Sequence, residues 1–364
     1  MRDVVLVGGG VMGCLSALEL LQAGCRVTLL ERGELGREAS WAGGGIVSPL
    51  YPWRYCDAVS ALSDWSQGYY PALAEALLEQ TGLDPEVHSC GLLWLDHDEQ
   101  ELALSWAGAH AKPLRSVDAD FIYQQVPQLA AGFRGALWQL GLANVRNPRL
   151  MQSLRARLVQ FDEFTLHEHC AVESLLRDGD AVLGVDCAVG RIEADAVVLC
   201  AGAWSGDWLA QVGLNLPVEP VKGQMLLYKM APGWLPSIVM AQGRYAIPRR
   251  DGHILIGSTL EYEGYDKRTT EQALASLQAS AEALLPALAA QAPVAQWAGL
   301  RPGSPDGVPY IGPLSAMPGL WLNTGHFRNG LVLAPASCRL LTDLMLGRTP
   351  DIDPAPYLPD TRLN

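Results

Sequence analysis

The pattern Gly8-x-Gly10-x-x-Gly13 restricts the possible folds of this chain more than any other feature. It follows an apolar run at residues 4–7, which predicts a strand, and it opens a segment at residues 11–23 with apolar residues at helical spacing. The first glycine permits a tight turn, the second lets a pyrophosphate approach the backbone, and the third lets helix and strand pack closely. The pattern therefore predicts a strand–turn–helix unit that binds a dinucleotide.

An acidic residue completes this unit. Residues 27–30 predict a second strand, and Glu31 follows it at the position where a carboxylate accepts a hydrogen bond from a ribose hydroxyl. The positive end of the helix favours the phosphates, so no Lys or Arg is required there. Arg32 indicates either a contact with a 2′-phosphate or a stacked, solvated side chain. This fingerprint does not distinguish NAD from FAD.

Two loops of small residues favour a flavin. One spans residues 38–46, and the other spans residues 201–205 after a predicted strand at residues 194–200. Segments with so few bulky side chains let the backbone lie against a flat ring and its ribityl chain. From these loops and the N-terminal unit we expect cofactor contacts from Gly8, Gly10, Val11, Met12, Gly13, Glu31, Arg32, Glu38, Ala39, Ser40, Gly43, Gly44, Gly45, Ala201, Gly202 and Trp204.

Segments of two different characters alternate along the chain. Strands of a more antiparallel kind are predicted at residues 91–96, 224–229, 244–248 and 253–257, the last two joined as a hairpin. Amphipathic helices are predicted at residues 64–81, 99–111, 149–160 and 271–290. We therefore predict a two-lobed α/β (α+β) fold, in which a Rossmann-like FAD-binding domain is interleaved with an antiparallel-sheet substrate domain. The FAD-binding domain would comprise residues 1–85, 146–216 and 301–364, and the substrate domain residues 86–145 and 217–300.

Charge and cysteine usage limit the partners. The formal net charge is -13 and the sequence has no run of Lys or Arg, which argues against nucleic acid and anionic membrane surfaces. The eight cysteines are scattered without a CxxC pair, which favours reduced, buried thiols over disulfides or a zinc site, and no third ligand accompanies His167 and His169. The N-terminal apolar run is too short for a signal peptide, and no segment is long enough to span a membrane. We therefore expect a cytoplasmic enzyme with a small-molecule substrate and no metal.

Five motifs, in this order along the chain, carry a family resemblance: GGGVMG, SWAGGG, VVLCAGAWS, WAGLRPGSPDGVPYIG and GHFRNGLVLAP. Together they resemble the FAD-dependent amino-acid oxidases of the D-amino-acid oxidase superfamily, in particular the glycine oxidases of thiamine synthesis. The resemblance implies oxidation of glycine, sarcosine or D-alanine by O2 through hydride transfer to the flavin N5. It also implies a homo-oligomer, commonly a tetramer, and a transfer of product to thiazole synthase. FAD is expected to be non-covalent, because no Cys lies between Cys200 and Cys338, where sarcosine-type relatives attach their flavin.

The motif at residues 325–335 opens like a helix but offers the amide donors of its first turn no Asp or Glu. A reduced flavin carries negative charge around N1 and the C2 carbonyl, which free N–H groups and the positive end of a helix stabilise. The alternative is a glycine-rich cap on a packing helix. For the flavin we expect contacts from Val172 and from His326, Phe327, Arg328, Asn329, Gly330, Leu331 and Val332.

Arg301 stands between an apolar strand and a Pro-Gly turn, where a buried guanidinium requires a partner. It either binds a substrate carboxylate in a bidentate manner, as the resemblance implies, or pairs with Asp306. The resemblance also implies substrate contacts from Tyr245, Leu260 and Arg328, although Tyr245 is equally well explained as a half-buried strand aromatic. No protein side chain is assigned as acid or base, because the flavin carries out the oxidation.

Three other functions are consistent with parts of this pattern. A sarcosine oxidase or a D-amino-acid dehydrogenase would share the fold and Arg301. A flavin-binding protein without turnover would share the cofactor site, and an NAD-dependent reductase would share only the N-terminal fingerprint.

Overall fold

The N-terminal strand–turn–helix unit forms as the sequence predicts, in a computed structural model that describes residues 2–95 and 98–363. Strands β1 (Asp3–Val7) and β2 (Arg26–Leu30) pair in parallel, and helix α1 (Val11–Gln22) connects them. They belong to a six-stranded sheet with the order β18-β19-β12-β1-β2-β8, in which only β18 runs antiparallel to its neighbour. The other strands of this sheet are β8 (Phe164–His167), β12 (Ala196–Leu199), β18 (Tyr310–Pro313) and β19 (Leu320–Thr324).

Both faces of this sheet are covered, which explains why residues 4–7 of β1 are all apolar. Val4 and Leu6 pack in one hydrophobic cluster with α1 and with helix α9 (Gly330–Met345). Val5 and Val7 pack on the opposite face, against a three-stranded sheet of β9 (Val172–Asp178), β10 (Ala181–Cys187) and β11 (Gly190–Glu193). The sequence pattern did not predict this small sheet.

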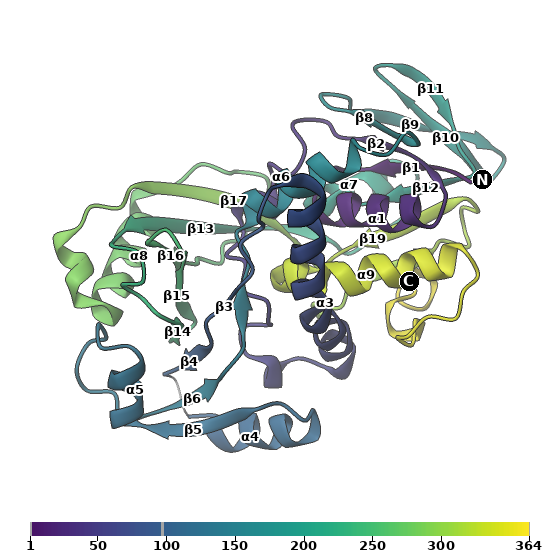
Figure 1. The fold of residues 1–364 in the computed structure, drawn as a ribbon. Helices are drawn as coiled ribbons and strands as arrows, with labels where there is room; N and C mark the ends of the chain where they lie inside the picture. The colour runs from purple at the N-terminus through teal and green to yellow at the C-terminus, as the bar shows by residue number, and fades with distance from the viewer. Residues whose placement is uncertain (1, 96–97, 364) are drawn as a thin grey trace.

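An eight-stranded sheet with the order β17-β13-β16-β15-β14-β4-β6-β5 forms the second lobe, seen beside the first in Figure 1. Its pairs are antiparallel except for β14 with β4. The predicted hairpin is confirmed as the pair β15 and β16, whereas Asp96, the last residue of the predicted strand 91–96, lies outside the described residues. The strands are β4 (Leu92–Trp94), β5 (Leu114–Asp118), β6 (Gly135–Gln139), β13 (Glu219–Lys229), β14 (Ile238–Ala241), β15 (Arg244–Pro248), β16 (His253–Gly257) and β17 (Ala295–Gly303).

The four predicted amphipathic helices form, with shifted ends. They are α3 (Asp57–Thr81), α4 (Gln100–Ala109), α6 (Asn147–Leu158) and α8 (Glu271–Leu284). Helix α8 ends before Pro286, which cannot continue the α-helical hydrogen bonds, and a 3-10 turn at Pro286–Ala290 replaces the predicted last turn. No helix in the described ranges is long and apolar enough to cross a membrane. Shorter elements are α2 (Ala39–Ala42), α5 (Ala119–Gln125), α7 (Ser205–Ala210), β3 (His88–Ser89), β7 (Ala143–Asn144) and the 3-10 turns at Pro52–Arg54, Gly202–Trp204, Phe327–Asn329, Ala355–Tyr357 and Pro359–Thr361.

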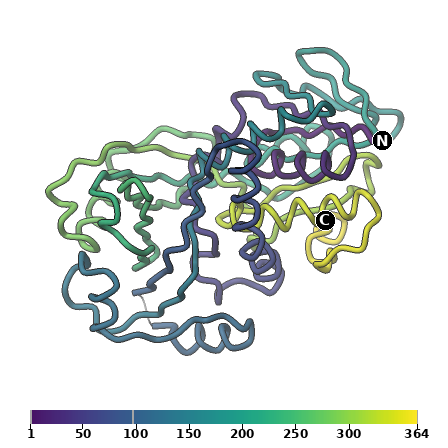
Figure 2. The backbone as a smooth tube through the Cα atoms, in the orientation of Figure 1, coloured from purple at the N-terminus to yellow at the C-terminus, as the bar shows by residue number. Residues whose placement is uncertain are grey.

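The chain passes between the lobes several times, as the tube in Figure 2 shows by its colours. N-terminal, middle and C-terminal segments all contribute to the six-stranded sheet, whereas the eight-stranded sheet takes its strands from residues 92–139 and 219–303. This arrangement confirms the predicted α/β class with parallel and antiparallel sheets. The proposed domain boundaries stay a prediction. Strand β17 continues across the proposed boundary between residues 300 and 301.

Candidate functional site

A cavity with a volume of about 500 Å³ is lined by residues from both lobes. Its walls include the glycine turn after β1, the loop around residues 38–46, the turn after β12 and the start of α9. Strands β13, β15 and β17 of the second lobe also contribute residues. The segments that the sequence singled out therefore converge on one space, although they lie far apart along the chain.

The glycine turn requires its glycines for the predicted steric reasons. Gly8 has a φ of +112°, and a Cβ there would lie 2.5 Å from the carbonyl oxygen of Cys200. A Cβ on Gly13 would lie 2.0 Å from the carbonyl oxygen of Gly8, so only glycine lets α1 start this close to the turn. Helix α1 has no acidic residue in its first turn, and only the neutral hydroxyl of Ser40 accepts from its first amide, that of Val11, at 2.8 Å within the described residues. Its positive end is therefore available to an anionic ligand in the cavity.

Glu31 and Arg32 stand together at the wall of the cavity. The Glu31 carboxylate is buried and accepts hydrogen bonds from the amides of Gly9 at 2.7 Å and Gly33 at 2.8 Å. Each oxygen keeps a lone pair, which suits the predicted contact with a ribose hydroxyl. The Arg32 guanidinium lies 3.7 Å from the ring centroid of Trp204, which corresponds to the stacked alternative for this residue.

The second lobe supports the small-residue loop. Gly45 has a φ of +83°, and a Cβ there would lie 2.1 Å from the carbonyl oxygen of Val145. Arg249, which is buried, donates to the carbonyls of Gly44 at 2.8 Å and Val145 at 2.9 Å. Burial lowers the pKa of Arg249 to about 10, and no acidic residue in the described part of the chain pairs with it directly. The loop thus keeps a fixed backbone at the point where the sequence predicts a flat ring.

The start of α9 matches the prediction that its amide donors lack an acidic partner. Neither Asn329 at its N-cap nor any side chain in its first turn caps the helix. His326 donates from Nε2 to the Ser337 hydroxyl at 3.1 Å, because that hydroxyl already donates to the carbonyl of Leu333 at 2.8 Å. The Nδ1 atom of His326 is then a buried acceptor, and it has no hydrogen-bond partner among the residues that the structure describes. Burial lowers the pKa of His326 to about 3, so the imidazole is neutral at pH 7.

Other buried polar atoms at the cavity also lack partners. Within the described ranges these are the Oδ1 atoms of Asn147 and Asn323 and the Nδ2 atom of Asn329. A buried polar atom without a partner costs roughly 1–3 kcal/mol, so such a group is expected to serve a ligand. FAD has a pyrophosphate, ribose and ribityl hydroxyls and a polar ring edge, and these features match the helix ends, the unpaired atoms and the glycine loops. The residues present therefore fit FAD.

Arg301 extends from β17 to the cavity without an acidic partner in the described part of the chain. Its guanidinium donates to the Ser258 hydroxyl at 2.7 Å and to the carbonyls of Lys222 at 3.2 Å and Thr259 at 3.3 Å. The alternative pairing with Asp306 is wrong, because Asp306 pairs with Arg362 at 2.9 Å. Burial lowers the pKa of Arg301, but an arginine stays protonated at neutral pH.

Tyr245 and Arg328 line the same cavity as Arg301. The Tyr245 side chain is buried, and its hydroxyl donates to the sulfur of Met225 at 3.4 Å. Leu260 is 45% exposed and does not line the cavity, so the expected contact with a substrate has no basis in the geometry. Of the expected cofactor residues, Gly13 alone is absent from the wall, because its role is to bring α1 close to the Gly8 turn.

Sequence reasoning missed several residues of the wall. Gly223 on β13 and Gly299 on β17 lie opposite each other, and a Cβ on either would collide, with Arg301 at 2.2 Å or with Ala42 at 2.5 Å. Glycine inside a strand often marks a close approach of a ligand or another segment, so this pattern was available in the sequence. Asn147 had no such pattern. The other missed residues include Ile46, Ser48, Cys170, Trp208, Met225 and Ser258.

Comparison with known proteins agrees with this site. The family model described as FAD dependent oxidoreductase matches residues 3–344. Glycine oxidase from Pseudomonas aeruginosa is 65% identical over 360 residues, covering 99% of this chain and 99% of the relative, and glycine oxidase from Pseudomonas putida is 59% identical, covering 100% and 99%. A bifunctional protein ThiO/ThiG from Trichormus variabilis is 32% identical over 96% of this chain and 53% of its own length.

Among solved structures, glycine oxidase from Geobacillus kaustophilus superposes with a TM-score of 0.92 and 30% identity, covering 98% of both chains. The fold and the resemblance inferred from the five sequence motifs are thereby confirmed. The chain belongs to the family of FAD dependent oxidoreductases and is an FAD-dependent amine oxidoreductase.

Proposed function

We propose that this enzyme oxidises glycine and other small amino acids with O2. Glycine, O2 and water would give glyoxylate, ammonia and hydrogen peroxide, and sarcosine and D-alanine would react in the same way. The single observation that supports this proposal is the Arg301 guanidinium, which lines the cofactor cavity and binds only neutral acceptors in the described structure. A substrate carboxylate would supply the anionic partner that this half-buried cation lacks.

The side chains around Arg301 would orient the substrate. Arg301 would bind the carboxylate, and the Tyr245 hydroxyl, which donates to a weak sulfur acceptor at 3.4 Å, would donate to the carboxylate instead. Bound FAD would supply the two-electron acceptor for the α-hydrogen and its electron pair, leaving an imine that water hydrolyses. The positive end of α9 would stabilise the negative charge that the oxidation places at this end of the cavity.

Relatives and composition support further parts of the proposal. The fusion named ThiO/ThiG in Trichormus variabilis supports a role in thiamine (thiazole) synthesis, with transfer of the product to a thiazole synthase. We also propose non-covalent FAD, a cytoplasmic location and a homotetramer. The eight cysteines, all free, support a reducing compartment.

A substrate panel tests the proposed function. Peroxide release should be measured with glycine, sarcosine, D-alanine, L-alanine and D-phenylalanine. We expect turnover of the first three and slow turnover of D-phenylalanine, because Tyr245 and Arg328 line the cavity together with Arg301 and would leave little volume beyond the α-carbon. L-Alanine should be inert, since its side chain would point where the hydrogen must lie. Turnover of L-alanine would contradict the anchoring by Arg301, and faster turnover of D-phenylalanine than of glycine would contradict the small pocket.

A further inference from the structure

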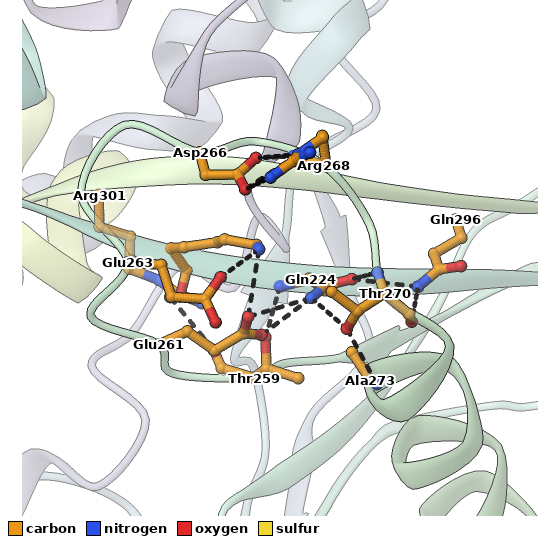
Figure 3. Close-up of polar contacts among 11 residues, drawn as sticks. Gln224, Thr259, Glu261, Glu263, Asp266, Arg268, Thr270, Ala273, Gln296 and Arg301 are labelled. Carbon is orange, nitrogen blue, oxygen red and sulfur yellow. Dashed lines mark hydrogen bonds and ion pairs between the residues drawn. The ribbon is translucent and has the colours of Figure 1, made fainter.

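Residues 259–270, which lie between β16 and α8, form a loop whose two ends meet on one buried side chain. The amide nitrogen of Gln224 on β13 donates to both carboxylate oxygens of Glu261, at 3.0 and 3.1 Å. Its amide oxygen accepts from the backbone N–H of Thr270 at 3.0 Å, at the other end of the loop. Figure 3 shows these contacts. We call residues 259–270 the strap, because a loop whose ends are held together forms one compact unit.

The first part of the strap is also fixed to β13. Lys222 and Glu261 exchange two backbone hydrogen bonds, of 2.9 and 3.0 Å. The ammonium of Lys222, whose side chain is fully buried, pairs with Glu261 at 3.3 Å and with Glu263 at 2.7 Å. The amide of Gln224 donates to the hydroxyl of Thr259 at 2.8 Å. The base of the strap is therefore a fixed part of the second lobe.

The tip of the strap reaches the other lobe at the wall of the cavity. The Tyr265 ring stacks on that of Trp204, with centroids 5.6 Å apart and planes inclined by 18°, and its hydroxyl donates to the carbonyl of Ala203 at 3.2 Å. Lys267 donates to both carboxylate oxygens of Glu38, at 2.9 and 3.0 Å. Glu38, Ala203 and Trp204 all line the cavity, and neither Tyr265 nor Lys267 does. The strap therefore supports the cavity wall without being part of it.

The tip joins two segments of the wall that are far apart in the sequence. Glu38 begins the 38–46 loop, and Trp204 belongs to the turn after β12. Arg32 contacts both, 3.6 Å from the Glu38 carboxylate and 3.7 Å from the Trp204 ring centroid. Both segments consist mostly of small residues, so few bulky side chains hold them in place by packing. Separating them would widen the cavity at this end, and a bridge between them opposes release of what the cavity holds.

We propose that the strap retains bound FAD, with Tyr265 and Lys267 as its two fastening residues. FAD would leave when the tip detaches and the 38–46 loop separates from the turn at Trp204. The inference goes beyond the proposed function, because it concerns the cofactor and does not depend on which amino acid is oxidised. It rests on the proposed non-covalent binding, since a covalently attached flavin would need no strap.

The rate of FAD release tests the role of Tyr265. Purified holoenzymes are diluted, and the change in flavin fluorescence gives the rate. Tyr265→Leu should release FAD about tenfold faster or more, because the ring stack and the hydrogen bond to Ala203 are both lost. Tyr265→Phe keeps the ring, so its rate should rise less than about fivefold. If Tyr265→Leu purifies without FAD, titration of the apoproteins with FAD replaces dilution, and the same order of the variants is expected.

The Lys267 contact has a signature of its own. Lys267→Met should release FAD about two- to fivefold faster, as expected for the loss of an ion pair at the surface. Raising the ionic strength should speed release more in wild type than in Lys267→Met, because the variant has no ion pair left to screen. A change in packing alone would not alter this dependence on salt.

Two matched controls lie in the same strap. Arg268 is the neighbouring cation, and its 88% exposed side chain pairs with Asp266 of the strap itself at 2.7 Å. Arg268→Met therefore removes the same charge as Lys267→Met without a contact to the other lobe. Tyr262 is 65% exposed, and its side chain has no ring or hydrogen-bond contact in the described part of the chain. Arg268→Met and Tyr262→Leu should both release FAD at the wild-type rate.

Wild-type release rates in both Tyr265→Leu and Lys267→Met would overturn the inference, as would equal acceleration in the two controls. Flavin that stays in the pellet when wild type is precipitated with acid would refute non-covalent binding, and with it a strap that retains the cofactor. These measurements need no substrate. A failure of the proposed function, seen as no peroxide release with glycine, therefore remains distinguishable from a failure of the strap.

Discussion

At the scale of single residues, the account depends most on Arg301, a half-buried cation that donates to the Ser258 hydroxyl and to two carbonyls. Arg301→Ala should lower kcat/KM for glycine by about 30- to 1000-fold, or ~2–4 kcal/mol, because a buried charge-assisted contact is lost. Arg301→Lys should recover only part of this loss, since an ammonium cannot bind a carboxylate in a bidentate manner. FAD content, measured from the absorbance of the purified protein, should not change. Loss of FAD with full activity in the remaining holoenzyme would show that Arg301 is structural.

His326, also a single residue, should make the stability of the folded protein depend on pH. Burial lowers its pKa to about 3 in the folded protein, against 6.5 for the free side chain. Below pH 6.5 the unfolded chain therefore binds more protons at this site, and stability falls as the pH drops from 6.5 toward 3, by up to about 1.4 kcal/mol per pH unit. Between pH 6.5 and 5, the free energy of unfolding in urea with saturating FAD should fall by about 1.6 kcal/mol less in His326→Asn than in wild type. Equal pH dependence in the two proteins would contradict this role.

At the scale of elements, β13 and β17 bring two glycines together, and Gly223 leaves room for the Arg301 side chain. A Cβ at Gly223 would lie 2.2 Å from the guanidinium. The end of a flexible side chain can move, so Gly223→Ala should keep the fold and displace Arg301, lowering kcat/KM for glycine about tenfold or more. Gly68→Ala in α3 is the control, since a Cβ there would meet no atom within 4 Å. Unchanged kcat/KM in Gly223→Ala would contradict the close approach of strand and guanidinium.

The elements that the sequence predicted are those whose residues pack or turn locally. The Gly8 turn, α1 and the β15–β16 hairpin depend on short patterns of glycine and apolar residues, and the structure confirms them. The strands β9 and β11 carry exposed polar residues along much of their length, so their alternation was too weak to predict a sheet. Their position is fixed by packing of β10 against the sheet, which is a tertiary effect.

At the scale of the whole molecule, the parts of the site that belong to a sequence motif could be predicted. The parts to which a distant segment contributes a single side chain could not. The glycine turn, the 38–46 loop and the start of α9 all reach the cavity as expected. Asn147 and Arg249 were missed, because nothing near them in sequence shows that α6 begins, and β15 ends, beside Gly44 and Gly45. The interleaving of the two lobes brings these ends together, and single-sequence patterns do not encode such contacts.

The central claim is that one cavity holds FAD and orients a small amino acid for oxidation by O2. Anaerobic titration of the purified holoenzyme with glycine tests it most directly, followed by admission of air. We predict that the flavin absorbance at about 450 nm is lost on addition of glycine and returns in air with release of hydrogen peroxide. Loss without return would indicate a dehydrogenase, and an unchanged flavin spectrum at saturating glycine would contradict the account.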